Sequence, residues 1–274
     1  MPEGPEIWRT ADTLNKTLKD KTITDLSFTI DELKDYENKL TAKKVTGVEA
    51  RGKAILTFFE GTLAMYSHNQ LYGLWKVSDN GIEPDTNRSL RVTIRNDEGA
   101  AFLYSATQIE MLDKSDISNH SYLKKLGPDV LHPDTTYEDI IGQYRSDSFK
   151  NRKLTTLLLD QGFVSGIGNY LRSEIMFYAG VSPNLKLREY SDEEKKRLAR
   201  ATVKLSNRSY ETGGITNDPP IVEALKREGA SRPDYRHFVY NRTDDRCHKC
   251  GRVIEEEKTG GRKIYFCTHC QLDE

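Results

Sequence analysis

The sequence has no long hydrophobic run and almost no net charge. No stretch approaches the about 18 consecutive apolar residues that a transmembrane helix needs, so we expect no membrane partner. Residues 1–6 are neither basic nor apolar, so we expect no secretory signal and a cytoplasmic protein. A formal net charge of −1 does not by itself indicate a nucleic-acid partner.

The small net charge hides an uneven distribution along the chain. Residues 226–267 hold eleven Lys or Arg and seven Asp or Glu, which gives this segment a net charge of +4. The rest of the chain is therefore acidic. Because a polyanion responds to local charge, the basic C-terminal segment is an indication of DNA or RNA binding.

Cysteine is scarce and confined to the last tenth of the chain. The four cysteines form two Cys-x-x-Cys pairs, sixteen residues apart: Cys247, Cys250, Cys267 and Cys270. This spacing is typical of a zinc ribbon, in which each pair supplies two thiolates to one tetrahedral ion. The alternative is two disulfides, which a reducing compartment disfavours. We therefore predict one structural Zn²⁺.

The residues between the cysteine pairs predict a β-hairpin. Its strands would be residues 252–254 and 263–266, joined by a turn near residues 259–261. His248 and His269 lie inside the Cys-x-x-Cys pairs. Four thiolates already complete a tetrahedron, so we expect both histidines to be solvated.

Hydrophobic periodicity predicts an α+β fold. Apolar residues at helical spacing indicate a helix over residues 5–19, with Pro5 in its first turn. Short alternating runs from about residue 22 to residue 109 indicate a mainly antiparallel sandwich or barrel. Farther along the pattern is helical, and Ser191 and Glu194 form a capping box. The clearest strands are residues 54–59, 90–94 and 101–104.

Changes in this pattern divide the chain into four segments. We expect an N-terminal β-sandwich domain over residues 1–125 and a linker over residues 126–136. A helical DNA-binding domain over residues 137–234 and a zinc finger over residues 235–274 would follow.

Residues 154–180 place two apolar helical stretches on either side of three glycines. Glycine lets the backbone turn sharply and approach a ligand closely. Asn169 would open the second helix, whose free backbone N–H groups suit a phosphate. The pattern fits either a helix-turn-helix-like DNA element or a plain helical hairpin with glycine caps.

Proline at position 2 is chemically distinctive. Removal of Met1 would leave a secondary amine, and an α-amino group has a pKa near 8 against about 10.4 for lysine. An unprotonated amine attacks an aldehyde carbon, and the resulting iminium permits elimination at the neighbouring carbon. Glu3 and Glu6 supply nearby carboxylates for proton transfer. The alternative is a plain lead-in to a helix.

Six motifs occur in order along nearly the whole chain. They are MPEGPEI at the start, RGKAIL around Lys53, YSHNQLYGLW at 66–75, GPDVL at 127–131, LLLDQGFVSGIGNYLRSEI at 157–175, and the four cysteines. Together they resemble the formamidopyrimidine-DNA glycosylase/endonuclease VIII family, and its endonuclease VIII branch in particular. The resemblance implies a β-sandwich, a helix–two-turn–helix and a zinc finger. It also implies excision of oxidised bases from damaged double-stranded DNA, followed by β,δ-elimination at the abasic site.

The resemblance implies four catalytic residues. Pro2 would be the nucleophile that forms the Schiff base, and Glu3 the general acid/base. Lys53 would assist β-elimination, although the residues alone allow a simple basic turn residue. Arg262 would hold phosphate and support δ-elimination. Nothing in the sequence argues for an oligomer, so we expect a monomer.

The resemblance also implies DNA contacts. Asn169 and Lys125 match phosphate-binding positions, but Lys125 replaces an arginine and so lacks its bidentate fork. Gln70, Leu71 and Tyr72 match the wedge that fills the void left by an extruded base, whose extrusion costs a few kcal/mol. Leu71 and Tyr72 would alternatively be strand core. A contiguous wedge favours oxidised pyrimidines as substrates.

Residues 218–233 depart from the endonuclease VIII pattern because they lengthen one loop. A long loop in this region holds an oxidised purine in the formamidopyrimidine branch, so the insertion leaves a strict pyrimidine preference open. The alternative is a surface insertion with a short helix at residues 221–227.

A second function is also consistent with the zinc ribbon and the helix-turn-helix-like element. It is a non-catalytic DNA-binding damage sensor or regulator. Such a protein would not need the combination of Pro2, Glu3 and Lys53, which favours the enzyme.

Overall fold

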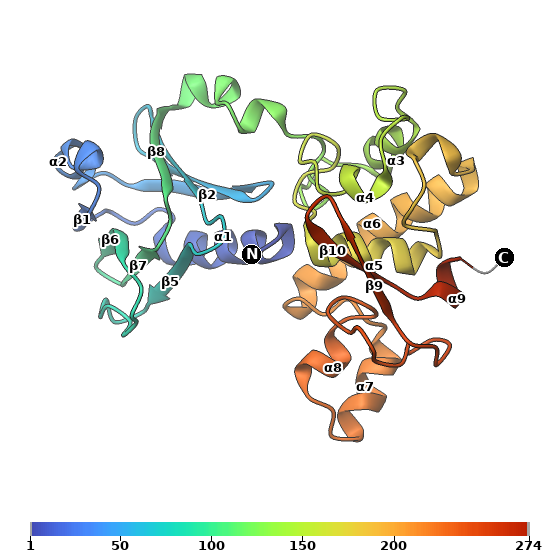
Figure 1. Cartoon of the computed structure of the whole chain (residues 1–274). Helices are drawn as coiled ribbons and strands as arrows, with labels where there is room; N and C mark the ends of the chain where they lie inside the picture. The colour runs from blue at the N-terminus through green and yellow to red at the C-terminus, as the bar shows by residue number, and fades with distance from the viewer. Residues whose placement is uncertain (1, 273–274) are drawn as a thin grey trace. The chain divides into compact units, whose positions relative to one another are not determined.

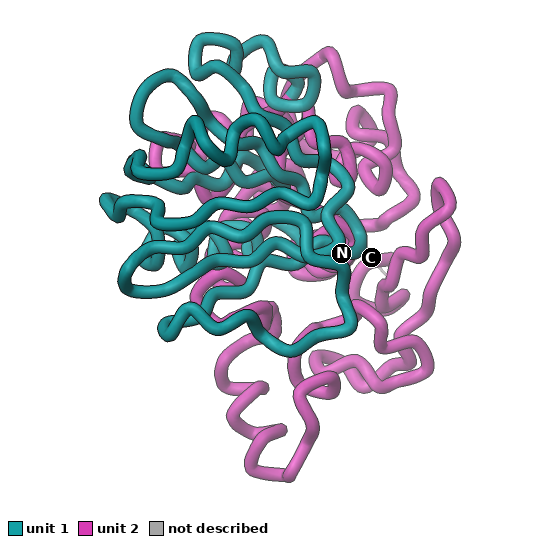
Figure 2. Tube along the Cα trace, turned by 90° about the vertical axis from the view of Figure 1, so that its left-hand side faces the viewer, with its two compact units in different colours: residues 1–125 teal, residues 126–274 magenta. Residues whose placement is uncertain are grey.

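The computed structural model describes residues 2–272 of the chain. The chain forms two compact units, residues 1–125 and residues 126–274, which Figure 2 distinguishes by colour. Over the described residues, no helix combines the length and the apolar character needed to cross a membrane.

The first unit is built on two four-stranded antiparallel sheets, as the alternating sequence pattern predicts. One sheet has the strand order β1-β6-β7-β5, and the other has the order β2-β3-β4-β8. The strands are β1 (Asp25–Phe28), β2 (Val45–Arg51), β3 (Ala54–Phe59), β4 (Leu63–His68), β5 (Leu74–Ser78), β6 (Leu90–Asn96), β7 (Gly99–Tyr104) and β8 (Gln108–Asp113).

Helix α1 (Gly4–Leu18) joins both sheets in one core, and the predicted helix at residues 5–19 is confirmed. Its apolar stripe includes Ile7 and Leu14, each 1% exposed. These side chains belong to one apolar cluster with Met65 of one sheet and Leu103 of the other. Because the sheets share this core, the start of α1 is a firmly anchored part of the unit.

Short helical segments complete the first unit. They are η1 (Asp31–Leu33), α2 (Asp35–Leu40), η2 (Lys114–Asn119) and η3 (Leu123–Lys125). Ile117 and Tyr122 pack with the buried Tyr66 on the outer face of the second sheet. The end of this unit thus covers a sheet face that would otherwise expose apolar surface.

The second unit is mostly helical (Figure 1). Helix α5 packs against α6, and α6 also packs against α3. Helix α5 begins at Asn169, as predicted, and the predicted capping box of Ser191 and Glu194 opens α6. The helices are α3 (Tyr137–Arg145), α4 (Leu154–Leu157), α5 (Asn169–Ala179), α6 (Asp192–Thr212), α7 (Pro219–Arg227), α8 (Arg232–Arg236) and α9 (Thr268–Gln271), together with the 3₁₀ turn η4 (Leu187–Glu189).

The insertion at residues 218–233 contains the predicted short helix. Helix α7 begins two residues earlier than expected because Pro219 suits the first helical turn. A second helix, α8, follows it and was not predicted. Its Ser231–Asp234 capping box explains why so short a segment is helical.

The hairpin of the finger consists of β9 (Glu255–Thr259) and β10 (Arg262–Phe266). The predicted outgoing strand at 252–254 is wrong, whereas the returning strand and the turn are confirmed. Residues 252–254 instead pair with residues 244–247: the Ile254 N–H donates to the Asp245 oxygen at 2.9 Å, and the Cys247 N–H donates to the Arg252 oxygen at 2.7 Å. The Ile254 side chain is fully buried in the core of the unit. The acidic β9 pairs with β10 at five positions, and the contact of Lys263 with Glu256 at 2.6 Å offsets part of its negative charge.

Candidate functional site

The N-terminus leads directly into the anchored helix α1. Pro2 is half-buried, and Glu3 is only 3% exposed at the N-cap position. Glu3 and Glu6 form a capping box, in which the Glu3 N–H donates to Glu6 Oε2 at 3.0 Å. Glu6 therefore stabilises the start of the helix, and the buried Glu3 is the carboxylate next to Pro2 in the sequence.

Lys53 lies in a two-residue turn between β2 and β3. Gly52 has a φ of +60°, and the flanking residues Arg51 and Ala54 pair directly, as in a type II′ hairpin. Lys53 is 6% exposed, and its N–H donates to the Tyr122 hydroxyl at 3.1 Å. This burial distinguishes Lys53 from an ordinary basic turn residue, which would be solvated.

His68 lies next to Lys53, although no prediction from the sequence gave it a role. It pairs with Ala54 at the end of β4, next to the Lys53 turn. Burial, and then the positive charge of Lys53, lower the pKa of His68 to about 4. The imidazole is therefore neutral at pH 7. Its Nδ1 accepts the N–H of Gln70 at 3.0 Å, which links the Lys53 turn to the Gln70–Leu71–Tyr72 motif.

Leu71 and Tyr72 are exposed rather than part of a strand core. They lie in the turn between β4 and β5, with exposed fractions of 59% and 66%. The Gly73 N–H closes the turn onto the Asn69 oxygen at 2.7 Å. A Cβ on Gly73 would lie 2.6 Å from that oxygen, so the tight turn requires glycine. Two apolar side chains are thus held outward on a constrained loop.

In the second unit, Asn169 and the strand of Arg262 are brought together. Asn169 Nδ2 donates to the Lys263 backbone oxygen at 3.1 Å, and Arg172 donates to the same oxygen at 2.8 Å and to Asn169 Oδ1 at 2.7 Å. One hydrogen of the Asn169 amide is used in this way, and its Nδ2 carries a second. The N-terminus of α5 and the start of β10 are therefore joined by one hydrogen-bonded cluster.

Arg262 is exposed at the beginning of β10. It follows a turn in which Gly260 and Gly261 have φ values of +58° and +81°, the pattern of a type I′ hairpin. Lys125 is exposed at the end of η3 in the first unit. Among the described contacts, none joins Lys125 to another predicted site residue.

The four cysteines converge on one point. Their sulfur atoms all lie within 4.8 Å of one another, and the cysteines are free. The closest described pairs are Cys250–Cys267 at 3.4 Å and Cys247–Cys270 at 3.9 Å. A disulfide needs about 2.0 Å, whereas four thiolates about 2.3 Å from one Zn²⁺ are about 3.8 Å apart. The thiolates fit one structural zinc ion, as the spacing predicts.

The two histidines of the finger differ from each other. His269 is exposed, as expected, but the expectation that His248 is solvated is wrong. Its Nδ1 lies 2.8 Å from Asn217 Nδ2 and 3.1 Å from a guanidinium nitrogen of Arg242. Burial and the Arg242 charge lower the pKa of His248 to about 4, so it is a neutral acceptor that joins the finger to the loop after α6.

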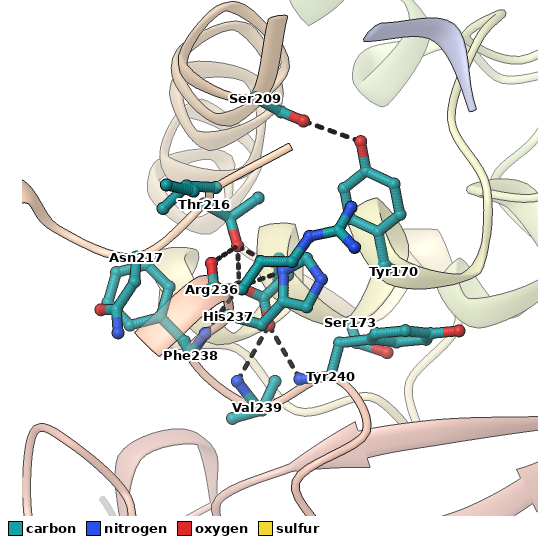
Figure 3. A network of polar contacts seen from close by, with 12 residues as sticks. Tyr170, Ser173, Ser209, Thr216, Asn217, Arg236, His237, Phe238, Val239 and Tyr240 are labelled. Carbon is teal, nitrogen blue, oxygen red and sulfur yellow. Dashed lines mark hydrogen bonds and ion pairs between the residues drawn. The ribbon is translucent and has the colours of Figure 1, made fainter. Parts of the chain in front are cut away.

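The second unit contains a buried carboxylate, Glu174, that the sequence motifs do not predict. Glu174 of α5 is fully buried and accepts the N–H groups of Phe238, Val239 and Tyr240 at 2.8–2.9 Å. It also accepts the Thr216 hydroxyl. Figure 3 shows this network, in which residues on both sides of the insertion meet. Burial raises the pKa of Glu174, and its four donors oppose that effect. The sequence offers one indication of this site: Glu174 is the one acidic residue in the largely apolar segment that forms α5.

Three protein families match successive parts of the chain. The formamidopyrimidine-DNA glycosylase N-terminal domain matches residues 1–108, and the formamidopyrimidine-DNA glycosylase H2TH domain matches residues 126–219. A zinc finger found in FPG and IleRS matches residues 244–272. These matches include the Lys53 turn, the N-terminus of α5 and the four cysteines.

Full-length relatives agree with the family matches. The chain is 42% identical over 271 residues to proteins named Endonuclease 8 from Klebsiella pneumoniae and Shigella sonnei, covering 99% of this chain and 100% of each relative. Among solved structures, a Lactococcus lactis formamidopyrimidine-DNA glycosylase bound to DNA containing an AP site has a TM-score of 0.80 at 20% identity. The match covers 99% of this chain and 100% of the Lactococcus chain, and it shows that the two share a fold. The chain therefore belongs to the formamidopyrimidine-DNA glycosylase family, whose endonuclease VIII members are bifunctional DNA glycosylases and AP lyases.

Proposed function

We propose that this protein is a base-excision-repair enzyme that removes oxidised bases, mainly pyrimidines, and cleaves the strand at the abasic site. The proposal rests on one observation, which is the set of functional side chains that the first unit contains. Pro2 and the buried Glu3 precede the anchored helix α1, and the same unit holds the buried Lys53 and the exposed Leu71 and Tyr72. The names of the curated relatives support the same activity.

In the proposed reaction, the Pro2 nitrogen bonds to C1′ of the damaged nucleotide as the glycosidic C1′–N bond breaks. Glu3 protonates the sugar oxygen and assists its opening, so the base departs with a proton and an iminium remains. Loss of a proton from C2′ then breaks the C3′–O bond, and loss of a second sugar proton breaks the C5′–O bond. Lys53 assists the first elimination, and Arg262 holds the phosphate released in the second.

The proposed DNA contacts come from polar and cationic residues of both units. Arg262, Asn169 and Lys125 would contact phosphates. Asn169 binds the Lys263 oxygen of β10, the strand that begins at Arg262, which supports a common role for these two residues. Leu71 and Tyr72 would enter the space left by the extruded base. When bound, Zn²⁺ holds Cys247, Cys250, Cys267 and Cys270 together, and this keeps the hairpin that carries Arg262 in place.

The finer organisation belongs to the same proposal. We infer a linker at residues 126–136 between a catalytic sandwich domain (1–125) and a helical domain (137–234), with the finger at 235–274. We also infer a monomer that acts on chromosomal DNA in the bacterial cytoplasm. Met1 lies outside the described residues, and the proposed chemistry requires its removal.

The decisive experiment is borohydride trapping on two duplexes, one with thymine glycol and one with 8-oxoguanine. The protein is first shown by intact mass to lack Met1. We expect a covalent adduct with thymine glycol, because borohydride reduces the iminium to a stable amine. A matched chain that retains Met1 should give none.

The pattern of adducts tests the substrate class as well. An adduct with both lesions would move attention to residues 218–233 as a region that widens base recognition. Tight binding without any adduct would favour the non-catalytic damage sensor. Full strand cleavage by the chain that retains Met1 would refute Pro2 as the nucleophile.

A further inference from the structure

The Lys53 turn is supported by a side chain that comes from much farther along the chain. The turn places Lys53 between the paired residues Arg51 and Ala54, so its N–H lies outside the pairs of β2 and β3. Lys53 is 6% exposed, and a buried N–H needs a hydrogen-bond partner. The hydroxyl of Tyr122 accepts it at 3.1 Å. Tyr122 lies between η2 and η3, in the segment that covers the outer face of the second sheet.

The ring of Tyr122 also contacts the histidine beside the turn. Its edge packs against the His68 imidazole, with ring centroids 5.3 Å apart and ring planes at 82°. His68 pairs with Ala54, the residue that ends the turn. One half-buried tyrosine therefore touches both the backbone of Lys53 and the neutral imidazole next to it.

Tyr122 is itself held by His120, which is 8% exposed. His120 Nδ1 accepts the N–H groups of Tyr122 and Leu123, each at 3.4 Å. Because Nδ1 is an acceptor, the ring proton is on Nε2, which lies 3.3 Å from Glu110 Oε2 of β8. Hydrogen bonds thus run from β8 through His120 and Tyr122 to the N–H of Lys53.

We propose that Tyr122 is a positioning residue for Lys53 during elimination at the abasic site, and that His120 and Glu110 hold Tyr122 for this role. The inference rests on the proposed glycosylase and lyase function. The Tyr122 hydroxyl fixes the Lys53 backbone, and the backbone sets the direction in which the Lys53 side chain leaves the turn. Such placement matters, since an error of about 1 Å costs about a hundredfold in rate. Tyr122 acts through Lys53 and not on the DNA itself.

The test removes the Tyr122 hydroxyl and keeps the ring, in Tyr122→Phe. Single-turnover cleavage is measured on a duplex with a preformed abasic site, using protein without Met1. We expect cleavage about tenfold slower than in the parent, because the Lys53 backbone loses one of its supports. The rate of borohydride trapping and the duplex affinity should stay unchanged, since Pro2 forms the Schiff base and the ring still packs on His68. A merely structural role would lower every one of these quantities.

The neighbouring Tyr66 supplies a matched control. Its ring centroid lies 6.1 Å from that of Tyr122, and its buried hydroxyl has no hydrogen-bond partner among the described residues. Tyr66→Phe should therefore cleave at the parental rate. At the half-exposed Glu110, Glu110→Gln keeps an oxygen acceptor for His120 and should resemble the parent. Glu110→Met loses that acceptor and should cleave about threefold more slowly.

A double-mutant cycle connects Tyr122 to Lys53. If Tyr122 acts only through Lys53, then Tyr122→Phe should add no further loss of cleavage to Lys53→Met. Additive losses would show that Tyr122 acts independently of Lys53 and would overturn the inference.

The inference also fails if Tyr122→Phe cleaves at the parental rate, because the hydroxyl then has no part in elimination. An equal loss in Tyr66→Phe would show that packing of the aromatic cluster is the cause, and slower trapping in Tyr122→Phe would show a general structural role. A parent chain that is not trapped on an abasic site would instead fail the proposed function itself, and the inference with it.

Discussion

Two hairpin turns of this protein present a cation in opposite environments. Lys53 follows Gly52 in the turn between β2 and β3, and Arg262 follows Gly261 in the turn between β9 and β10. Both turns are two residues long and depend on a glycine with positive φ. Yet Lys53 is 6% exposed, whereas Arg262 is solvent-exposed.

The difference shows that the same kind of two-residue turn can place a cation for two different roles. A buried ammonium is costly unless its surroundings compensate it, and its protonation responds to neighbours, which suits proton transfer. An exposed guanidinium keeps its charge and fits phosphate oxygens, which suits binding. Turn geometry is encoded locally in both cases, but burial, and with it the proposed role, comes from the surrounding unit.

Removing zinc should give the largest effect, because it acts on the whole Arg262 turn. We expect chelation of the full chain to weaken duplex affinity more than Arg262→Ala does, by tenfold or more beyond it, which is about 1.4 kcal/mol. Loss of the hairpin also removes the Lys263 oxygen that Asn169 and Arg172 bind. Fluorescence anisotropy with a duplex measures affinity, and metal analysis confirms the loss of zinc.

The control for zinc removal is the first unit. Its core has no cysteine, so its thermal transition should persist in the chelated protein. Equal affinities for the zinc-free chain and for Arg262→Ala would show that the finger contributes only that side chain.

Removing the charge at each turn in separate variants should distinguish an effect on strand cleavage from an effect on DNA binding. Arg262→Ala should lower duplex affinity by about 1–3 kcal/mol and reduce the slope of log affinity against log salt by about 0.9, because one phosphate contact is lost. Lys53→Met should slow strand cleavage while leaving that slope unchanged. Binding titrations at several salt concentrations and single-turnover cleavage measure the two quantities. A changed salt slope for Lys53→Met would show that Lys53 also contacts phosphate, and the proposed difference between the two turns would be wrong.

The third effect concerns pH and, of the two turns, arises at the Lys53 turn. The pKa of His68 is about 4 in the folded chain against about 6.5 when unfolded, so the fold favours the neutral imidazole. As pH falls from about 6.5 towards about 4, the unfolded chain takes up the proton first and the free energy of unfolding decreases. His68→Gln should therefore make this decrease shallower.

Tryptophan fluorescence can follow that unfolding selectively. Both tryptophans, Trp8 and Trp75, lie in the first unit, and denaturant titrations at several pH values will report on it. Arg262→Ala is the matched control and should follow the parent at every pH. A parental pH dependence in His68→Gln would show that another group titrates there.

Much of the architecture could be predicted because its signals are local. The spacing of Ile7, Ala11, Leu14 and Leu18 identified α1, and alternation identified the strands of the sandwich. Residues 252–254 misled the prediction because an extended run does not reveal its partner: they pair with residues 244–247 and not with the returning strand. The acidic β9 has no such run and depends on its partner strand.

The proposed site divides in the same way. Sequence by itself determined which residues can do the chemistry: Pro2 as an amine, Glu3 as an acid, and four cysteines spaced for one zinc ion. Only the tertiary structure decided that Lys53 is buried beside a neutral His68, that Glu174 gathers three distant backbone N–H groups, and that Leu71 and Tyr72 are exposed in a turn rather than buried in a strand. Covalent capability belongs to a residue type and its spacing, whereas burial and protonation depend on neighbours that the chain brings from far along its length.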